Sequence, residues 1–220
     1  VWSECVNEKL KVGFTGGADG KLKVYDLNES SRSGYLSHSF TLSAIALQSG
    51  SAMKKGEIIK SYYDFGSGML AVSSTGKFFV VESNFSHWKF LFQNFNFGNF
   101  AILTGFQSSS VVVAADKLGH ILVLKFDDSA EVVQKNEFQI SDLSRIGNLI
   151  SVQTNDAKML LLVDSQNPKE QFLFLEIDPV SLTLATQKSL VKPQEKIIAS
   201  TAIIDSRDTG FLVVGCRYCM

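Results

Sequence analysis

The stretch that decides the fold runs from residue 12 to residue 27 and reads Val12-Gly13-Phe14-Thr15-Gly16-Gly17-Ala18-Asp19-Gly20-Lys21-Leu22-Lys23-Val24-Tyr25-Asp26-Leu27. Two short runs with alternating apolar residues stand on either side of an Asp-Gly pair. Such a pair is typical of a two-residue hairpin turn, because both turn positions favour positive φ. The stretch therefore predicts a strand, a tight turn at Asp19-Gly20 and a second strand.

The same pattern recurs along the chain. Residues 69–83 and 111–126 repeat it around Gly76 and Gly119, residues 159–177 repeat it with a longer loop, and a fifth copy begins at residue 211. The turn glycines Gly20, Gly76 and Gly119 lie 56 and 43 residues apart, close to the ~40–45 residues of a four-stranded propeller blade. Further strands are predicted between the hairpins, at residues 39–47, 85–92, 100–106, 131–140, 149–153, 182–187 and 197–204.

No helix of any length is predicted, and only a single helical turn is considered, near Asp142. We therefore predict an all-β fold, a β-propeller of four-stranded antiparallel blades with about four to five blades present. Residues 1–220 are all assigned to one propeller domain, whose ring is expected to be incomplete in this chain.

One segment carries a family resemblance. Residues 17–27 resemble the end of a WD40 repeat, with Tyr25-Asp26 where Trp-Asp is typical, and His38 with the residues up to Leu47 is similar to the opening strand of the next blade. The later copies have Val-Glu, Leu-Lys and Leu-Glu at the dipeptide position. The resemblance therefore implies a degenerate WD40-type β-propeller, a family of protein-interaction modules.

Charge and composition narrow the function classes. The chain has 21 basic and 22 acidic residues, well interspersed, and a formal net charge of -1. This balance argues against nucleic acid as the main partner. Apolar runs are interrupted by polar residues too often for a membrane-spanning helix. The three cysteines, Cys5, Cys216 and Cys219, do not form a disulfide framework, so an intracellular location is expected.

Residues that could carry chemistry are few. His38, His87 and His120 have no Cys, His or carboxylate at a recognised metal-ligand spacing. Cys216 and Cys219 form a lone Cys-x-x-Cys, which is interpreted as packing because zinc would need a second pair. No catalytic, cofactor-binding or metal-ligating residue is predicted, and the protein is predicted not to be an enzyme.

The most unusual segment is rich in phenylalanine. It runs from Phe85 to Phe106 and can be interpreted either as core packing between blades or as an exposed aromatic groove for a partner. The loop at residues 94–99 is the exception, because asparagine and glycine favour a loop in which phenylalanine is less easily buried. The partner-contact residues are predicted to be Phe95, Phe97, Asn96 and Trp88.

These features favour a non-catalytic scaffold, a WD40-like subunit of a larger intracellular complex that binds other protein subunits. The alternative is an RNA- or DNA-associated propeller subunit of a nuclear nucleoprotein complex, and an enzymatic propeller is the least favoured class. No cofactor is expected.

Overall fold

The computed structural model of the chain describes residues 3–7, 11–16, 21–27, 35–52, 54–98, 101–140, 145–153, 158–165, 167, 169, 172–190, 196–204 and 210–217. The chain divides into two compact units. The first comprises residues 1–101 with 126–132, and the second comprises residues 102–125 with 133–220.

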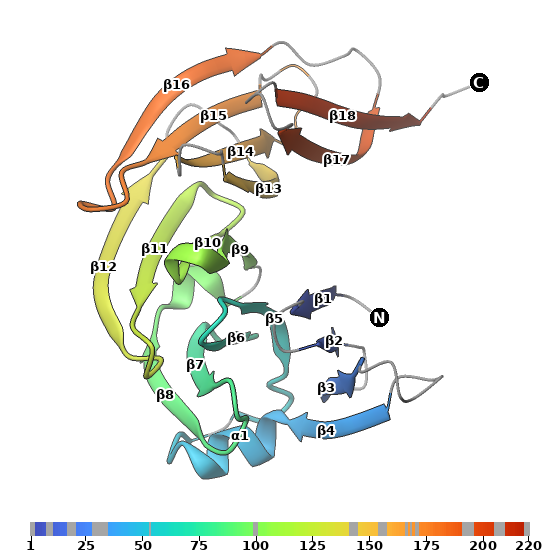
Figure 1. Cartoon of the computed structure of the whole chain (residues 1–220), viewed down its shortest axis with the longest axis vertical. Coiled ribbons are helices and arrows are strands. Elements are labelled where there is room, and N and C mark those ends of the chain that lie inside the picture. The colour runs from blue at the N-terminus through green and yellow to red at the C-terminus, as the bar shows by residue number, and fades with distance from the viewer. Residues whose placement is uncertain are drawn as a thin grey trace. The chain divides into compact units, whose positions relative to one another are not determined.

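Strands dominate the structure, and they pair in the order in which they occur along the chain (Figure 1). The first two four-stranded sheets are β1 (Ser3–Asn7), β2 (Val12–Gly16), β3 (Lys21–Asp26) and β4 (Tyr35–Thr41), then β5 (Ile59–Asp64), β6 (Gly68–Ser73), β7 (Lys77–Glu82) and β8 (Trp88–Gln93). The next two are β9 (Ile102–Phe106), β10 (Val111–Ala115), β11 (His120–Phe126) and β12 (Val132–Gln139), then β13 (Ile146–Gln153), β14 (Met159–Ser165), β15 (Phe172–Ile177) and β16 (Leu184–Leu190). A two-stranded sheet of β17 (Lys196–Ile204) and β18 (Gly210–Arg217) follows.

Neighbouring strands within the sheets are antiparallel from β1 to β8, from β9 to β11 and from β13 to β18. Successive four-stranded antiparallel sheets of this kind are the repeating unit of a propeller. The prediction of an all-β, propeller-like fold is confirmed.

The predicted hairpins coincide with the two middle strands of each four-stranded sheet. They are β2–β3, β6–β7, β10–β11 and β14–β15, and the predicted fifth copy coincides with β18. The turn at Asp19-Gly20 and the helical turn near Asp142 lie outside the described residues. The assignment of the whole chain to one domain stays a prediction.

One segment was predicted wrongly as a strand. Residues 39–47 were expected to be extended, but β4 ends at Thr41 and the helix α1 (Leu42–Gln48) follows. The Thr41 side chain accepts a hydrogen bond from the Ala44 amide at 3.2 Å, which satisfies one of the free amides of the first turn. Leu42, Ile45 and Ala46 are spaced for a helix and are buried. His38 consequently lies in β4, the fourth strand of the first sheet, and does not open the next one.

The middle strands form the core of each unit. Every residue of β6 and of β10 is buried, because side chains on both faces of these strands are covered. The outer strand β12 instead alternates half-buried and exposed residues along its whole length. The hairpin turns at the ends of the buried strands are therefore held on a rigid base.

A backbone feature repeats before three of the fourth strands. Phe85, Ala130 and Leu182 precede β8, β12 and β16, and each is a buried apolar residue with a positive φ of 55°, 57° and 54°. Each amide donates to a carbonyl three or four residues earlier, that of Glu82, Asp127 or Asp178. Apolar L-residues rarely adopt this conformation, so its recurrence shows a repeat that the side-chain identities conceal.

Candidate functional site

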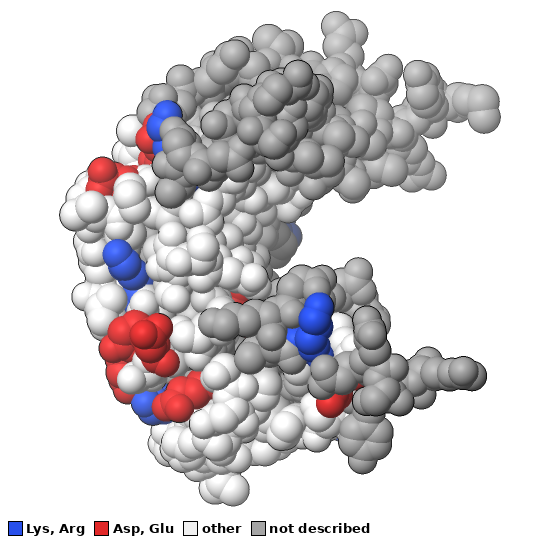
Figure 2. Space-filling view, viewed as in Figure 1, with Lys and Arg blue, Asp and Glu red and all other residues white. Residues whose placement is uncertain are grey.

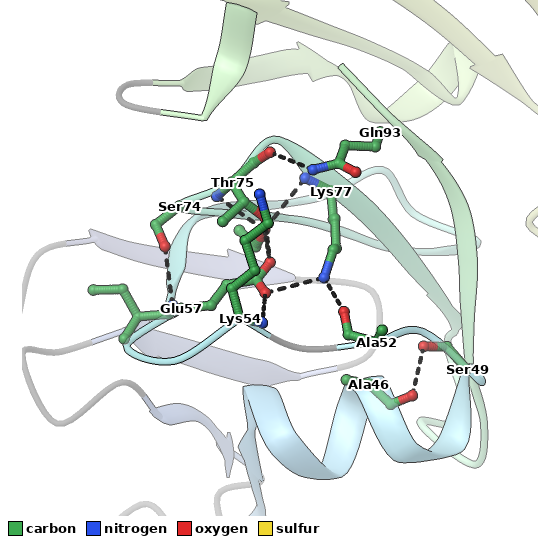
Figure 3. A network of polar contacts seen from close by, with 11 residues as sticks. Ala46, Ser49, Ala52, Lys54, Glu57, Ser74, Thr75, Lys77 and Gln93 are labelled. Carbon is green, nitrogen blue, oxygen red and sulfur yellow. Dashed lines mark hydrogen bonds and ion pairs between the residues drawn. The ribbon is translucent and has the colours of Figure 1, made fainter. Parts of the chain in front are cut away.

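The described residues contain two networks of buried polar groups, and both are built on a hairpin turn between the second and third strands of a sheet. In the first unit, the turn joins β6 to β7 and contacts the segment before β5 (Figure 3). Glu57 accepts hydrogen bonds there from the Ser73 hydroxyl at 2.6 Å, the Thr75 hydroxyl and the Lys54 amide at 2.9 Å. The Lys77 ammonium lies 3.0 Å from the same carboxylate.

The carboxylate of Glu57 is fully shielded from solvent and the side chain of Lys77 is 8% exposed. Burial raises the pKa of Glu57, but the hydrogen bonds from Lys54, Ser73, Thr75 and Lys77 outweigh it, and the pKa lies at about 2. Lys77 also donates to the carbonyl oxygen of Ala52. Because these contacts join the turn to the residues before β5, the network fixes the turn against the preceding segment.

The second network lies in the other unit, on the turn between β10 and β11. Asp116 is buried, and its Oδ1 atom accepts hydrogen bonds from the amides of Leu118 at 2.8 Å and His120 at 2.9 Å. Its Oδ2 atom lies 2.6 Å from Nδ1 of His120, whose side chain is 36% exposed. An ionised carboxylate can only accept, so Nδ1 is the donor in this contact, and in the neutral tautomer that makes it Nε2 has the free lone pair.

The two turns are built alike. Ser73 Oγ accepts from the amides of Thr75 and Lys77, as Asp116 Oδ1 does from the amides two and four residues later. His120 therefore occupies the position of Lys77, directly after the turn glycine. The difference is that Lys77 is buried against a carboxylate from another segment, whereas His120 is half exposed and its carboxylate belongs to its own turn.

A glutamine secures each turn from the last residue of the fourth strand. Gln93 Nε2 donates to the carbonyl of Thr75 at 2.9 Å, and Gln139 Nε2 donates to the carbonyl of Leu118 at 2.8 Å. This repeated contact was missed in the sequence. The signal that marks it is a Phe-Gln pair at the end of both strands, at residues 92–93 and 138–139.

The predicted partner-contact residues separate into two groups. Phe95 is 70% exposed with the Lys54 ammonium 5.8 Å from its ring centroid, and Asn96 is also exposed. Phe97 is 1% exposed and packs edge-on against Phe78, and Trp88 is fully buried. The 3₁₀ turn at Phe95–Phe97 buries the second ring, so Phe97 and Trp88 fit the interpretation of the segment as core packing. Partner contact is tested for none of the four residues and stays a prediction.

The remaining candidate residues do not assemble a second site. His38 stacks on Phe40, and His87 is exposed in the connection before β8. Within the described part of the chain, no three His, Cys, Asp or Glu side chains lie together as metal ligands would, and no helix could cross a membrane. The side chains of Cys216 and Cys219 lie outside the described residues. Among the described residues on the face in Figure 2, charges of both signs are interspersed.

No family model matches the sequence, and no curated protein matches it. Among solved structures, the chain is similar to a candidate 6-phosphogluconolactonase from Bacteroides fragilis (13% identity, TM-score 0.60, 94% of this chain and 61% of that one). It is also similar to the periplasmic gluconolactonase of Pseudomonas aeruginosa (11% identity, TM-score 0.62, 96% and 61%) and to BBS1N in complex with ARL6DN (12% identity, TM-score 0.59, 98% and 60%).

These likenesses support a β-propeller fold, and the chain spans about three fifths of the length of each neighbour. They do not support a WD40 assignment in particular. The prediction of a non-catalytic scaffold, with its nucleic-acid alternative, is corrected. The finding that contradicts it is that several neighbours are named as lactonases, whereas an enzymatic propeller is the class that the sequence favoured least. A fold of this kind does not fix function, and the pairing of His120 with Asp116, four residues earlier, was not recognised in the sequence.

Proposed function

We propose that this chain is part of a propeller enzyme that hydrolyses a lactone of a sugar acid, with His120 as general base. The observation that carries the proposal is the contact between Asp116 and His120. A buried carboxylate holds the proton on Nδ1 and leaves Nε2, on a half-exposed ring, able to accept a proton. The names of two of the structural neighbours supply the substrate class.

The reaction follows from these roles. Nε2 of His120 accepts a proton from a water molecule while the water oxygen bonds to the carbonyl carbon of the lactone. The tetrahedral intermediate then breaks its bond to the ring oxygen, which takes the proton back from the imidazolium. The product is the open-chain hydroxy acid. Asp116 stays ionised throughout and stabilises the imidazolium by its charge, as the carboxylate of a catalytic triad does.

The competing interpretation is that His120 only caps its turn. Asp116 already caps that turn through the amides of Leu118 and His120, which needs no imidazole. Lys77 shows that a different side chain is accommodated at the matching position of the β6–β7 turn. The imidazole is therefore not required by the backbone, and this supports a chemical role.

The test uses the full-length natural protein and measures acid release from glucono-δ-lactone and from 6-phosphogluconolactone. The rate of spontaneous hydrolysis is subtracted. His120→Gln and Asp116→Asn are compared with His87→Gln, which changes an exposed histidine outside the turn. Loss of a general base lowers kcat/KM about 10²- to 10⁴-fold, so His120→Gln is expected to fall in this range while His87→Gln is unchanged. Equal rates for His120→Gln and the unaltered protein would refute the proposal.

Two finer assignments belong to the same proposal. A WD40-type first blade is supported by Tyr25-Asp26, which closes β3, the third strand of its sheet. An intracellular location is supported by three cysteines without a disulfide-framework spacing.

A further inference from the structure

We infer that Gln139 is a positioning residue for His120, an inference that rests on the proposed function of that histidine. Gln139 is the last residue of β12, and it is exposed. Its side-chain Nε2 donates to the carbonyl of Leu118 at 2.8 Å and lies 3.4 Å from the carbonyl of Ile140. Leu118 lies within the turn between Asp116 and His120, so the contact acts on the segment that joins the two.

Three consecutive carbonyls of the turn are held by residues at the end of β12 and at the start of β13. The carbonyl of Lys117 accepts from the Ile146 amide at 2.9 Å, and that of Gly119 accepts from the Ile140 amide at 2.9 Å. The carbonyl between them is that of Leu118, and its donor is the side chain of Gln139. Gln139 is the one side chain in this set of donors, so substitution can remove its bond without touching the backbone.

The space around the turn leaves little room for it to move. Gly119 has a φ of +92°, and a Cβ atom at this position would lie 2.6 Å from the carbonyl oxygen of Ile140. The turn is therefore in direct contact with the end of β12. Positioning of a catalytic group to within about 0.5 Å depends on such supporting contacts. Loss of the Gln139 bond removes this donor from the carbonyl of Leu118 while the two backbone bonds remain, and even a small adjustment of the turn lengthens the contact between Asp116 and His120.

The chain provides a matched control. Gln93 makes the same bond to the carbonyl of Thr75 in the β6–β7 turn, at 2.9 Å, and the Asn94 amide donates to Gly76 as the Ile140 amide does to Gly119. That turn carries Lys77 in place of histidine. Gln93→Met and Gln139→Met therefore remove the same hydrogen bond from the same local structure, and only the second removes it from a histidine turn.

The experiment compares these two variants by NMR and by kinetics. The ¹⁵N shifts of the His120 ring, assigned with His120→Gln, report which nitrogen carries the proton. We expect Gln139→Met to shift them towards a mixture of the two tautomers, while Gln93→Met leaves them unchanged. In lactone hydrolysis, kcat is expected to fall about three- to tenfold for Gln139→Met with KM unchanged, as for the loss of one exposed hydrogen bond.

The two readouts separate the failure of this inference from failure of the proposed function. Unchanged His120 shifts in Gln139→Met, with Asp116→Asn as the positive control, overturn the positioning role whatever the activity. A change in the shifts without any lactone hydrolysis by the unaltered protein supports the positioning role and overturns the proposed function. If Gln139 has a purely structural role, Gln93→Met and Gln139→Met should lower the melting temperature equally and should have the same kcat and KM. The ¹⁵N shifts of the His120 ring should then not change in either variant.

Discussion

Replacement of Glu57 by glutamine tests whether the buried polar network stabilises the first unit. The substitution keeps the size of the side chain but removes the charge that faces Lys77, whose side chain is only 8% exposed. Breaking one partner of a buried ion pair costs about 3–5 kcal/mol, because the other charge is left in a poorly solvated position. We expect Glu57→Gln to lower the free energy of unfolding by an amount in this range at pH 7.

The pH dependence of stability provides a second, independent value for the contribution of the Glu57 charge to the free energy of unfolding. The pKa of Glu57 is about 2 in the folded protein against 4.5 for the free side chain. The unfolded state therefore binds the proton more readily, and ionisation of Glu57 contributes stability that is fully present above about pH 5. This contribution is about 3 kcal/mol and is lost as the pH falls from 4.5 towards 2. Glutamine does not titrate, so the two proteins should become more alike in acid.

The assay is urea unfolding between pH 7 and pH 2.5, followed by tryptophan fluorescence, since Trp88 is fully buried in the same unit. Glu131→Gln is the matched control, because Glu131 pairs with Lys89 at 2.7 Å on the surface, where solvent screens the charges. It is expected to leave the unfolding midpoint unchanged. Equal stability of Glu57→Gln and the unaltered protein at pH 7, or a difference that does not shrink in acid, would refute the reasoning.

Three further predictions concern the backbone and the core, and differential scanning calorimetry checks each of them. Gly119→Ala is expected to lower the free energy of unfolding by at least about 2 kcal/mol, since its Cβ would lie 2.6 Å from a carbonyl oxygen. Gly50→Ala is the control, because the space around Gly50 is open. It should lose only about 1 kcal/mol, which comes from its positive φ. Phe97→Ala should lower the free energy of unfolding by about 3–5 kcal/mol, because it truncates a core side chain. Phe95→Ala changes an exposed side chain and should alter it by no more than about 0.5 kcal/mol. Equal losses in the two variants would contradict the assignment of their exposure. Thr41→Ala should cost about 1 kcal/mol through loss of the helix cap, and an unchanged melting temperature would show that the cap does not stabilise α1.

Local patterns predicted the hairpins well because their causes are local. The glycines at 76 and 119 have φ of +76° and +92°, as their turns require, and the runs on either side are long enough to form buried strands. The helix α1 was missed because residues 39–47 contain apolar residues at spacings that fit a strand as well as a helix. The discriminating signal was Thr41, a good N-cap, followed by Leu42, Ile45 and Ala46 on one helical face.

The polar sites could be predicted only in part. Asp116 and His120 stand four residues apart across a recognised turn, so the sequence contained the signal for their contact. Glu57 gave none, because it lies 20 residues before Lys77 and reaches it through the pairing of β5 with β6. Phe95 is exposed and Phe97 is buried because of the 3₁₀ turn that contains them. The alternation of apolar and polar residues, which predicts exposure along a strand, does not apply within such a turn.

The repeat separates what the fold needs from what is left for chemistry. In both turns the capping side chain, the glycine and the glutamine from the fourth strand make the same contacts. The residue directly after the glycine differs, and so does its partner. Lys77 is buried against Glu57 and stabilises its unit, whereas His120 is half exposed and held by Asp116. Because the backbone of the turn is secured by other groups, this position tolerates different side chains, and the proposed function uses His120 there, together with Asp116 as its cap, as the proton acceptor.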